Sequence, residues 1–150
     1  MMTFRISKMC NIRTTLLLLT TIIYSIKSTE SGAVQLTAQN INNTLASHEL
    51  VFIMFYADWC RHSKLLMPIF DETADSIAKE FPEAGKVVMG KVDCEKERSL
   101  FSKYKIKKYP TLIAISNGPP VKREKYTGER TVEALTTFIK KQMMEVKKLK

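Results

Sequence analysis

Several features that mark specialised protein classes are scarce or missing in this sequence. Cysteine occurs three times in 150 residues, and glycine and proline occur five times each. Three cysteines are too few for a disulfide-stapled scaffold, and they lack the paired spacing of a zinc site. The low glycine and proline content, with no long polar tract, excludes a collagen-like or disordered chain. A chain of this length has room for one globular domain and not for a multidomain enzyme.

The excess of positive charge is concentrated at the two ends of the sequence. The formal net charge is +9, but residues 1–29 hold four basic residues and no acidic one, and residues 140–150 hold five lysines and one glutamate. The stretch from 30 to 139 is left with 15 basic and 14 acidic residues. A nucleic-acid-binding protein needs a basic face with stacking aromatics or a reading helix, and the sequence has no such array. We therefore expect no nucleic-acid partner.

The first 29 residues have the pattern of a secretory signal peptide. Basic residues precede the apolar run Leu16–Tyr24, and small residues follow at Ser25 and Ser28. The run is shorter than the roughly 20 residues that span a membrane, so an uncleaved signal anchor is the less favoured alternative. Cleavage near Ser25 or Ser28 would remove Cys10 and leave a domain in an oxidising compartment, with no stable membrane insertion.

Hydrophobic periodicity predicts an α/β protein with one domain over residues 30–142. Strand-like runs occur at 34–37, 51–57, 86–93, 111–116 and 122–127, and helical spacing occurs at 40–45, 60–81, 98–104 and 131–143. The run at 51–57 is continuously apolar, as in a central strand covered on both faces. The last two strands form a hairpin whose second strand alternates like an edge strand. Asn40 and Thr131 are predicted helix caps, and the last helix is expected to fray into a lysine-rich tail at 143–150.

A Cys-x-x-Ser motif, in the segment Trp59-Cys60-Arg61-His62-Ser63-Lys64, begins the helix expected at 60–81. A thiol at a helix N-terminus meets the positive end of the helix dipole and unpaired N–H groups, and both favour the thiolate. Arg61 and His62, when protonated, add positive charge, and the Ser63 hydroxyl can donate a hydrogen bond to the sulfur. In a Cys-x-x-Cys dithiol the second sulfur releases the bound partner, which serine cannot do. The motif predicts a nucleophilic Cys60 that captures a partner's cysteine and holds it until another thiol resolves the adduct.

Other reactive residue types have plainer explanations. Out of context, Cys60 could equally be a buried cysteine at a helix start. Cys94, directly after the strand at 86–93, is predicted to be a small buried hydrophobe, and a disulfide between the two would need Cα atoms within about 7 Å. His62 either tunes the thiol's charge or faces solvent, and the first is favoured. Asn42 begins an Asn-x-Thr glycosylation sequon, which has meaning only behind a signal peptide.

Residues from about 34 to 143 resemble the thioredoxin and protein disulfide isomerase family. The matching residues are Phe55-Tyr56-Ala57-Asp58-Trp59-Cys60, Lys64, Pro68, Val92-Asp93 and Tyr109-Pro110-Thr111. The resemblance implies a thioredoxin fold, a central mixed β-sheet flanked by helices, in which Pro110 is cis and its loop faces Cys60. It also implies a partner-binding surface formed by Trp59, Tyr109, Pro110 and Thr111, with Thr111 offering backbone groups to a partner peptide.

A narrower resemblance is to monothiol members of that family. It is carried by Arg61 and Ser63 beside Cys60, by Cys94, and by the segments 108–112 and 117–118. Those members are chaperones of the endoplasmic reticulum lumen that hold client proteins and oxidoreductases through mixed disulfides. They continue into further domains that are missing here, which makes this chain either a fragment or a short secreted relative. Dithiol members bury a carboxylate six residues before the nucleophile, where this sequence has Met54, so the proton relay is missing too, although core packing also explains a methionine there.

The sequence thus predicts a luminal domain that captures cysteine-bearing clients or oxidoreductases at Cys60 and assists thiol-dependent folding and retention. It implies no cofactor and no metal ion. Two alternatives stay open: a glutathione-assisted monothiol disulfide isomerase, and a non-redox chaperone or interaction module that uses exposed apolar surface near the site.

Overall fold

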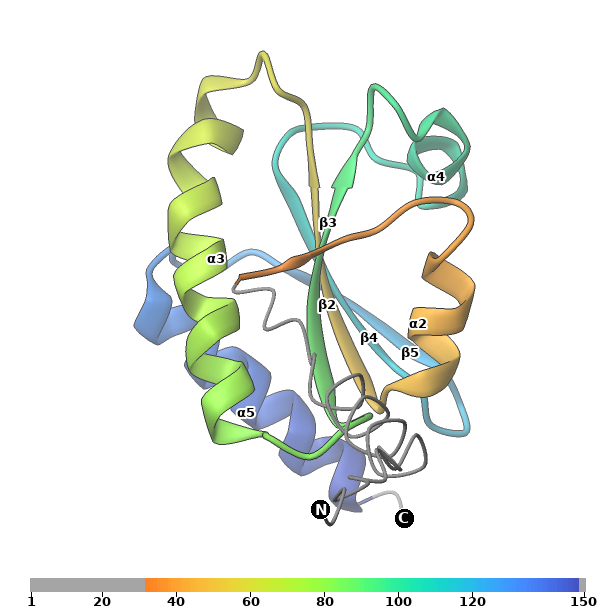
Figure 1. The fold of residues 1–150 in the computed structure, drawn as a ribbon, viewed down its shortest axis with the longest axis vertical. Coiled ribbons are helices and arrows are strands. Elements are labelled where there is room, and N and C mark those ends of the chain that lie inside the picture. The colour runs from red at the N-terminus through yellow and green to blue at the C-terminus, as the bar shows by residue number, and fades with distance from the viewer. Residues whose placement is uncertain (1–31, 149–150) are drawn as a thin grey trace, which may run out of the picture. The chain divides into compact units, whose positions relative to one another are not determined.

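The computed structural model describes residues 32–148 of the chain (Figure 1). The elements, in chain order, are β1 Val34–Gln35, α2 Ile41–Ser47, β2 Leu50–Tyr56, α3 Arg61–Glu80, β3 Val87–Asp93, α4 Arg98–Lys103, β4 Thr111–Ser116, β5 Lys122–Tyr126 and α5 Val132–Lys148. The predicted signal peptide at 1–29, Cys10 within it, and the last two residues of the predicted tail lie outside the described residues. None of the described helices is long and apolar enough to cross a membrane.

A five-stranded mixed sheet forms the middle of the domain, in the order β1-β3-β2-β4-β5. β2 is the central strand, as predicted: it runs parallel to β3 and antiparallel to β4, and all seven of its residues are buried. A strand buried on both faces needs apolar side chains at every position, which explains its continuous apolar run. β5 is an edge strand paired only with β4 among the described strands, and its charged side chains suit that position.

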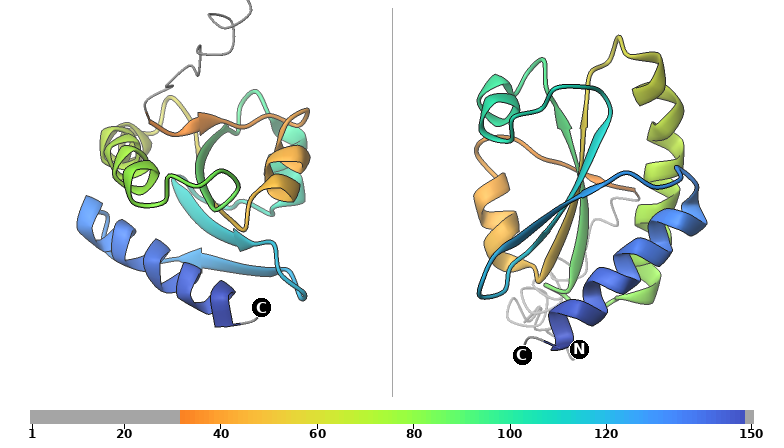
Figure 2. Two further views of the ribbon diagram at one scale, coloured as in Figure 1. Left: turned by 60° about the horizontal axis from the view of Figure 1, so that its bottom comes forward. Right: turned by 180° about the vertical axis from the view of Figure 1, so that it is seen from behind.

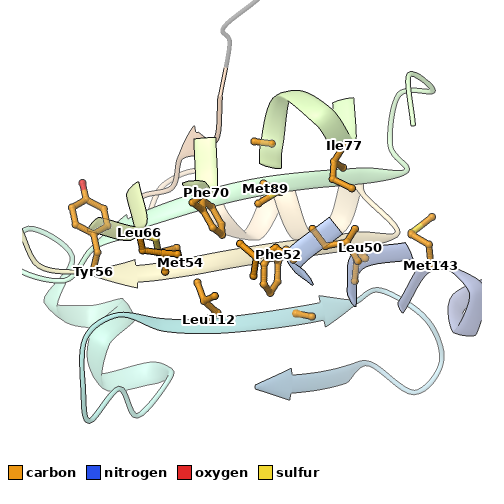
Figure 3. Packing of buried hydrophobic residues seen from close by; sticks show 14 residues of the cluster. Leu50, Phe52, Met54, Tyr56, Leu66, Phe70, Ile77, Met89, Leu112 and Met143 are labelled. Carbon is orange, nitrogen blue, oxygen red and sulfur yellow. The ribbon is translucent and has the colours of Figure 1, made fainter. Parts of the chain in front are cut away.

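Helices cover both faces of the sheet (Figures 1 and 2). Alternate β2 residues point to opposite faces. Phe52 and Met54 pack under α3 and α5, in a cluster drawn in Figure 3 with Phe70 of α3. Ile53 and Phe55 point to the other face, with side chains from α2 and α4. The predicted thioredoxin fold, a mixed sheet flanked by helices, is confirmed.

Strand register places the ends of four elements at one edge of the sheet. Near the end of β2, Phe55 pairs with Thr111, the first residue of β4, and Tyr56 pairs with Asp93, the last residue of β3. Leu112 of β4 pairs with Tyr126, the last residue of β5. The segments 57–60, 94–97, 107–110 and 127–131 therefore emerge at the same edge, although they are far apart in the sequence.

Local details depart from the sequence predictions at both ends of the described chain. Asn40 precedes α2, but its side chain makes no capping bond and instead accepts a hydrogen bond from the Thr37 N–H at 2.8 Å. Thr131 does cap α5, since its hydroxyl accepts the Ala134 N–H at 3.2 Å. α5 continues to Lys148 and buries Val146, so residues 143–148 are part of the last helix and not a frayed tail. The last turn stays helical because its apolar residue Val146 packs against the domain, while Lys147 and Lys148 remain exposed.

Candidate functional site

Cys60 lies at the start of α3, four residues after the end of the central strand. It occupies the N-cap position, so the helix proper begins at Arg61. Its N–H donates to the Ala57 carbonyl at 3.0 Å, and its own carbonyl accepts the Lys64 N–H at 3.1 Å. The thiol is partly exposed and is not in a disulfide. This is the helix-terminus position predicted from the motif.

The surroundings of Cys60 favour its thiolate. The backbone N–H of Ser63 is the largest cause that lowers the pKa of the Cys60 thiol; partial burial opposes it, and the Ser63 hydroxyl and the His62 N–H add smaller contributions. Unpaired N–H groups of a first helical turn stabilise an anion in this way. The dominant donor is thus the backbone N–H, one of the contributions predicted from the sequence, and the serine hydroxyl contributes less.

Ser63 stands where a dithiol site has its second cysteine. Its side chain is completely buried, and its Oγ has no hydrogen-bond partner of ordinary length and angle among the described residues. A serine oxygen cannot attack a disulfide as a thiolate does, so the site lacks an internal second nucleophile. Met54, at the position of the missing carboxylate, is fully buried in the core, as expected for either explanation of it.

The loop before β4 faces the Cys60 sulfur, as the family resemblance implied. The Tyr109–Pro110 peptide bond is cis, and the Cys60 Sγ donates to the Tyr109 carbonyl oxygen at 3.7 Å. The Thr111 hydroxyl donates to the Lys108 carbonyl at 2.7 Å and closes this turn on itself. Thr111 is buried and already paired with Phe55, whereas Tyr109 is half-buried.

An exposed tryptophan and a half-buried tyrosine lie near the thiol. Trp59 is 67% exposed, and its ring meets the edge of Tyr109 with a centroid distance of 5.8 Å. Tyr109 in turn contacts Phe101, with a centroid distance of 6.2 Å. A large exposed aromatic residue is common in interaction surfaces. The structure thus brings Trp59, Tyr109 and Pro110 to one side of Cys60.

The cation with the largest effect on Cys60 is Arg130, which sequence reasoning missed. That reasoning assigned this role to Arg61 and to the His62 ring. In the structure both side chains are exposed, and the contribution of His62 comes from its N–H. Arg130 is 70 residues away in sequence, and only the shared sheet edge brings it close. The predicted hairpin gives a signal for this position. In a hairpin the end of the second strand lies beside the start of the first, so the residues after β5 lie near the loop before β4.

A hydrogen bond shapes the loop that carries Arg130. The Tyr126 hydroxyl donates to the Glu129 carbonyl at 2.6 Å. Gly128 lies inside this arc, and a Cβ there would come within 2.6 Å of the Tyr126 hydroxyl oxygen. A side chain at position 128 is therefore incompatible with the loop as it stands.

Cys94 has the opposite character to Cys60. It is completely buried, and burial raises the pKa of its thiol to about 11. Its environment agrees with the prediction that it is a buried hydrophobe, and it is unpaired like Cys60. Asn42 of the sequon is exposed on α2 and accepts a hydrogen bond from Lys103 at 3.4 Å.

Comparison with known proteins identifies the family. The thioredoxin family model matches residues 32–141. The chain belongs to the thioredoxin family. Human endoplasmic reticulum resident protein 44 is 42% identical over 132 residues, which cover 88% of this chain and 32% of the relative. Protein disulfide-isomerase 1 of Dictyostelium discoideum is 39% identical over 114 residues, covering 75% of this chain and 30% of that protein.

The solved structures support the same assignment. The structure of a zinc-bound form of human ERp44 matches with a TM-score of 0.70 and 39% identity, covering 75% of this chain and 30% of that one. The chain thus spans about a third of the length of these thioredoxin-family relatives. No group of three or more His, Cys, Asp or Glu residues within residues 32–148 could hold a metal ion. Relatives named as endoplasmic reticulum residents agree with the predicted location in that compartment.

Proposed function

We propose that this thioredoxin-family domain captures cysteine-bearing client proteins or oxidoreductases in the endoplasmic reticulum lumen through a mixed disulfide at Cys60. The observation that carries the proposal is the pairing of an accessible thiol of lowered pKa with a buried serine three residues later. The same arrangement would let the domain assist thiol-dependent folding and retention, the role predicted from the sequence. Residues 1–29 would direct the chain to the lumen, and residues 30–142 with the rest of α5 would form the capturing domain.

The reaction is a thiol–disulfide exchange in which no further oxidant is needed. The Cys60 thiolate attacks one sulfur of a client disulfide, or of a client cysteine already joined to glutathione. The new disulfide joins Cys60 to the client, and the other sulfur leaves as a thiolate that takes a proton from solvent. Release requires a second thiol from outside the domain, because Ser63 cannot attack and Cys94 is buried. The adduct therefore persists until glutathione or another protein thiol resolves it.

Groups near Cys60 have distinct roles in this proposal. The N–H groups of Ser63 and His62 and the charge of Arg130 stabilise the Cys60 thiolate. They act both when this thiolate attacks the client disulfide and when it is released again by the external thiol. Arg61 and His62, which are exposed beside the thiol, would contact the client. Trp59 and the Tyr109–Pro110 turn would position the client's chain next to the sulfur.

The test is a non-reducing gel of tagged protein from cells quenched with an alkylating agent. Wild type is compared with Cys60→Ala and Ser63→Cys, and Cys94→Ala serves as the matched control thiol. We expect high-mass, reducible adducts in wild type and Cys94→Ala, none in Cys60→Ala, and fewer in Ser63→Cys because the second thiol releases the client. Full alkylation of Cys60 in wild type, with no adduct, would refute covalent capture.

Two outcomes would favour the alternatives. Catalysed refolding of a scrambled disulfide substrate in the presence of glutathione, lost in Cys60→Ala, would favour a monothiol isomerase. Client binding that survives Cys60→Ala would favour a non-redox chaperone that uses the exposed surface around Trp59.

A further inference from the structure

Two surface pockets near Cys60 share one residue, Arg130. One pocket, of about 120 Å³, is lined by the turn at Pro110 and by the basic side chains of Lys108, Lys125 and Arg130. The other, of about 160 Å³, is formed on α3 by apolar residues, among them Leu65, and also includes Arg130. Arg130 borders both pockets and acts on the Cys60 thiol. Pro110 of the first pocket follows Tyr109, whose carbonyl faces the Cys60 sulfur, and His62 of the second pocket lies two residues after Cys60, so both pockets lie near the site.

The pocket beside Pro110 is unusually rich in positive charge for its size. None of the described residues that line it is acidic, and its three cations make no ion pair within residues 32–148. Some cations elsewhere on the domain, such as Lys91 and Lys140, contact a carboxylate. The other exposed lysines of the described chain that make no ion pair, such as Lys79 and Lys141, do not line this pocket. Glu129 precedes Arg130, but it does not line the pocket, and its carbonyl is held by Tyr126. Clefts lined by charge of one sign concentrate ligands of the opposite sign.

The size of the pocket limits what can occupy it. Pockets for small-molecule ligands have volumes of about 300–1,000 Å³, well above the roughly 120 Å³ available here. This space suits a single side chain of a longer ligand. The longer ligand of this site, on the proposed function, is a client segment that reaches Cys60.

We infer that the domain selects client cysteines with an acidic residue close by in sequence, whose carboxylate lies among Lys108, Lys125 and Arg130. The inference rests on the proposed function and narrows its substrate class. An apolar residue elsewhere in the same client segment fits the second pocket, at Leu65, a side chain that is 60% exposed.

The test measures the rate at which reduced protein attacks short peptides. Each peptide carries one cysteine disulfide-linked to the same chromogenic aromatic thiol, and the flanking residues are aspartate, serine or lysine, placed before or after the cysteine. Release of the chromophore reports attack by Cys60, and the rate with free glutathione corrects for each peptide's own reactivity. We expect the aspartate peptides to react about tenfold faster than the lysine peptides at low ionic strength. In about 1 M salt, where the Debye length is about 3 Å, the ratio should fall below about threefold.

Charge reversal in the pocket provides the decisive comparison. Lys108→Glu with Lys125→Glu should abolish or invert the preference, whereas reversal of Lys79 and Lys141, two exposed lysines that line neither pocket, should leave it intact. Equal rates for all peptides in wild type would overturn the inference while leaving covalent capture in place. A preference that survives Lys108→Glu with Lys125→Glu would also overturn it. No reaction with any peptide would overturn the proposed function and this inference together.

Discussion

Replacing the serine of the motif separates two explanations of the reactive thiol. Ser63→Ala removes the hydroxyl but keeps the backbone N–H, which is the largest cause of the lowered pKa of Cys60. A hydrogen bond to a charged group contributes about 1.5–3 kcal/mol. If the hydroxyl were the main donor, its loss would lower the thiolate fraction at acidic pH by about tenfold or more. With the N–H retained, we expect a loss of less than about threefold.

The same substitution has a second readout in stability. The Ser63 Oγ is buried without a partner of ordinary geometry within residues 32–148, and such a group costs about 1–3 kcal/mol. Alanine removes this cost and leaves a space of one atom, so we expect the free energy of unfolding to stay the same or rise by about 1 kcal/mol.

Two assays check these expectations. The rate of Cys60 alkylation between pH 4 and 9 reports the thiolate fraction, in a Cys94→Ala background so that only one thiol reacts. Denaturant unfolding at acidic pH reports stability with the thiol protonated. Ser76→Ala, on the same helix and away from the thiol, is the control. A tenfold fall in alkylation at acidic pH, together with a loss of stability, would refute the assignment to the backbone.

Three further predictions follow from the same edge of the sheet. Arg130→Gln should raise the pKa of the Cys60 thiol and slow its alkylation at acidic pH, and the effect should be smaller in high salt. Alkylation rates over a pH series at two ionic strengths would measure both effects. An unchanged pH profile would show that Arg130 does not act on the thiol. Between pH 9.0, the ordinary pKa of a thiol, and about pH 11, the unfolded chain loses the Cys94 proton while the folded chain keeps it. The free energy of unfolding should therefore fall by about 2–3 kcal/mol across this pH window. Denaturant titrations at several pH values would measure the fall, which should be smaller in Cys94→Ala. Gly128→Ala should break the hydrogen bond of Tyr126 and destabilise the domain by about 1–3 kcal/mol, and an unaltered melting temperature would contradict the close contact.

Features encoded within one segment of sequence could be predicted. The continuous apolar run at 51–57 predicted the central strand, which the structure places at Leu50–Tyr56, because both faces of that strand are covered. The helical start at Cys60 was equally local, since strand, loop and helix follow one another without interruption. The hairpin of β4 and β5 and the Thr131 cap were predicted for the same reason.

Features that depend on distant contacts could not be predicted in the same way. The role of Arg130 depends on strand register across β2, β4 and β5, and the predicted hairpin supplies only the β4–β5 part of that register. The end of α5 was placed too early because the lysines of its last turns suggested solvent, while the burial of Val146 became visible only with the packing of the helix. The Asn40 side chain was expected to cap α2, but its oxygen accepts a hydrogen bond from the Thr37 N–H instead.

The two thiols of the domain show how one sheet edge produces opposite chemistry. Cys60 and Cys94 each follow a strand, and those strands, β2 and β3, are parallel neighbours that end at the same level. One thiol meets free N–H groups and solvent, so its anion is stabilised; the other is completely buried, and burial is the largest cause that keeps its proton in place. A site with one active and one silent thiol can form a disulfide with a partner but cannot close one within itself. Persistence of the client adduct would therefore be set by the supply of external thiols, and the lifetime of the adduct should scale inversely with the concentration of glutathione.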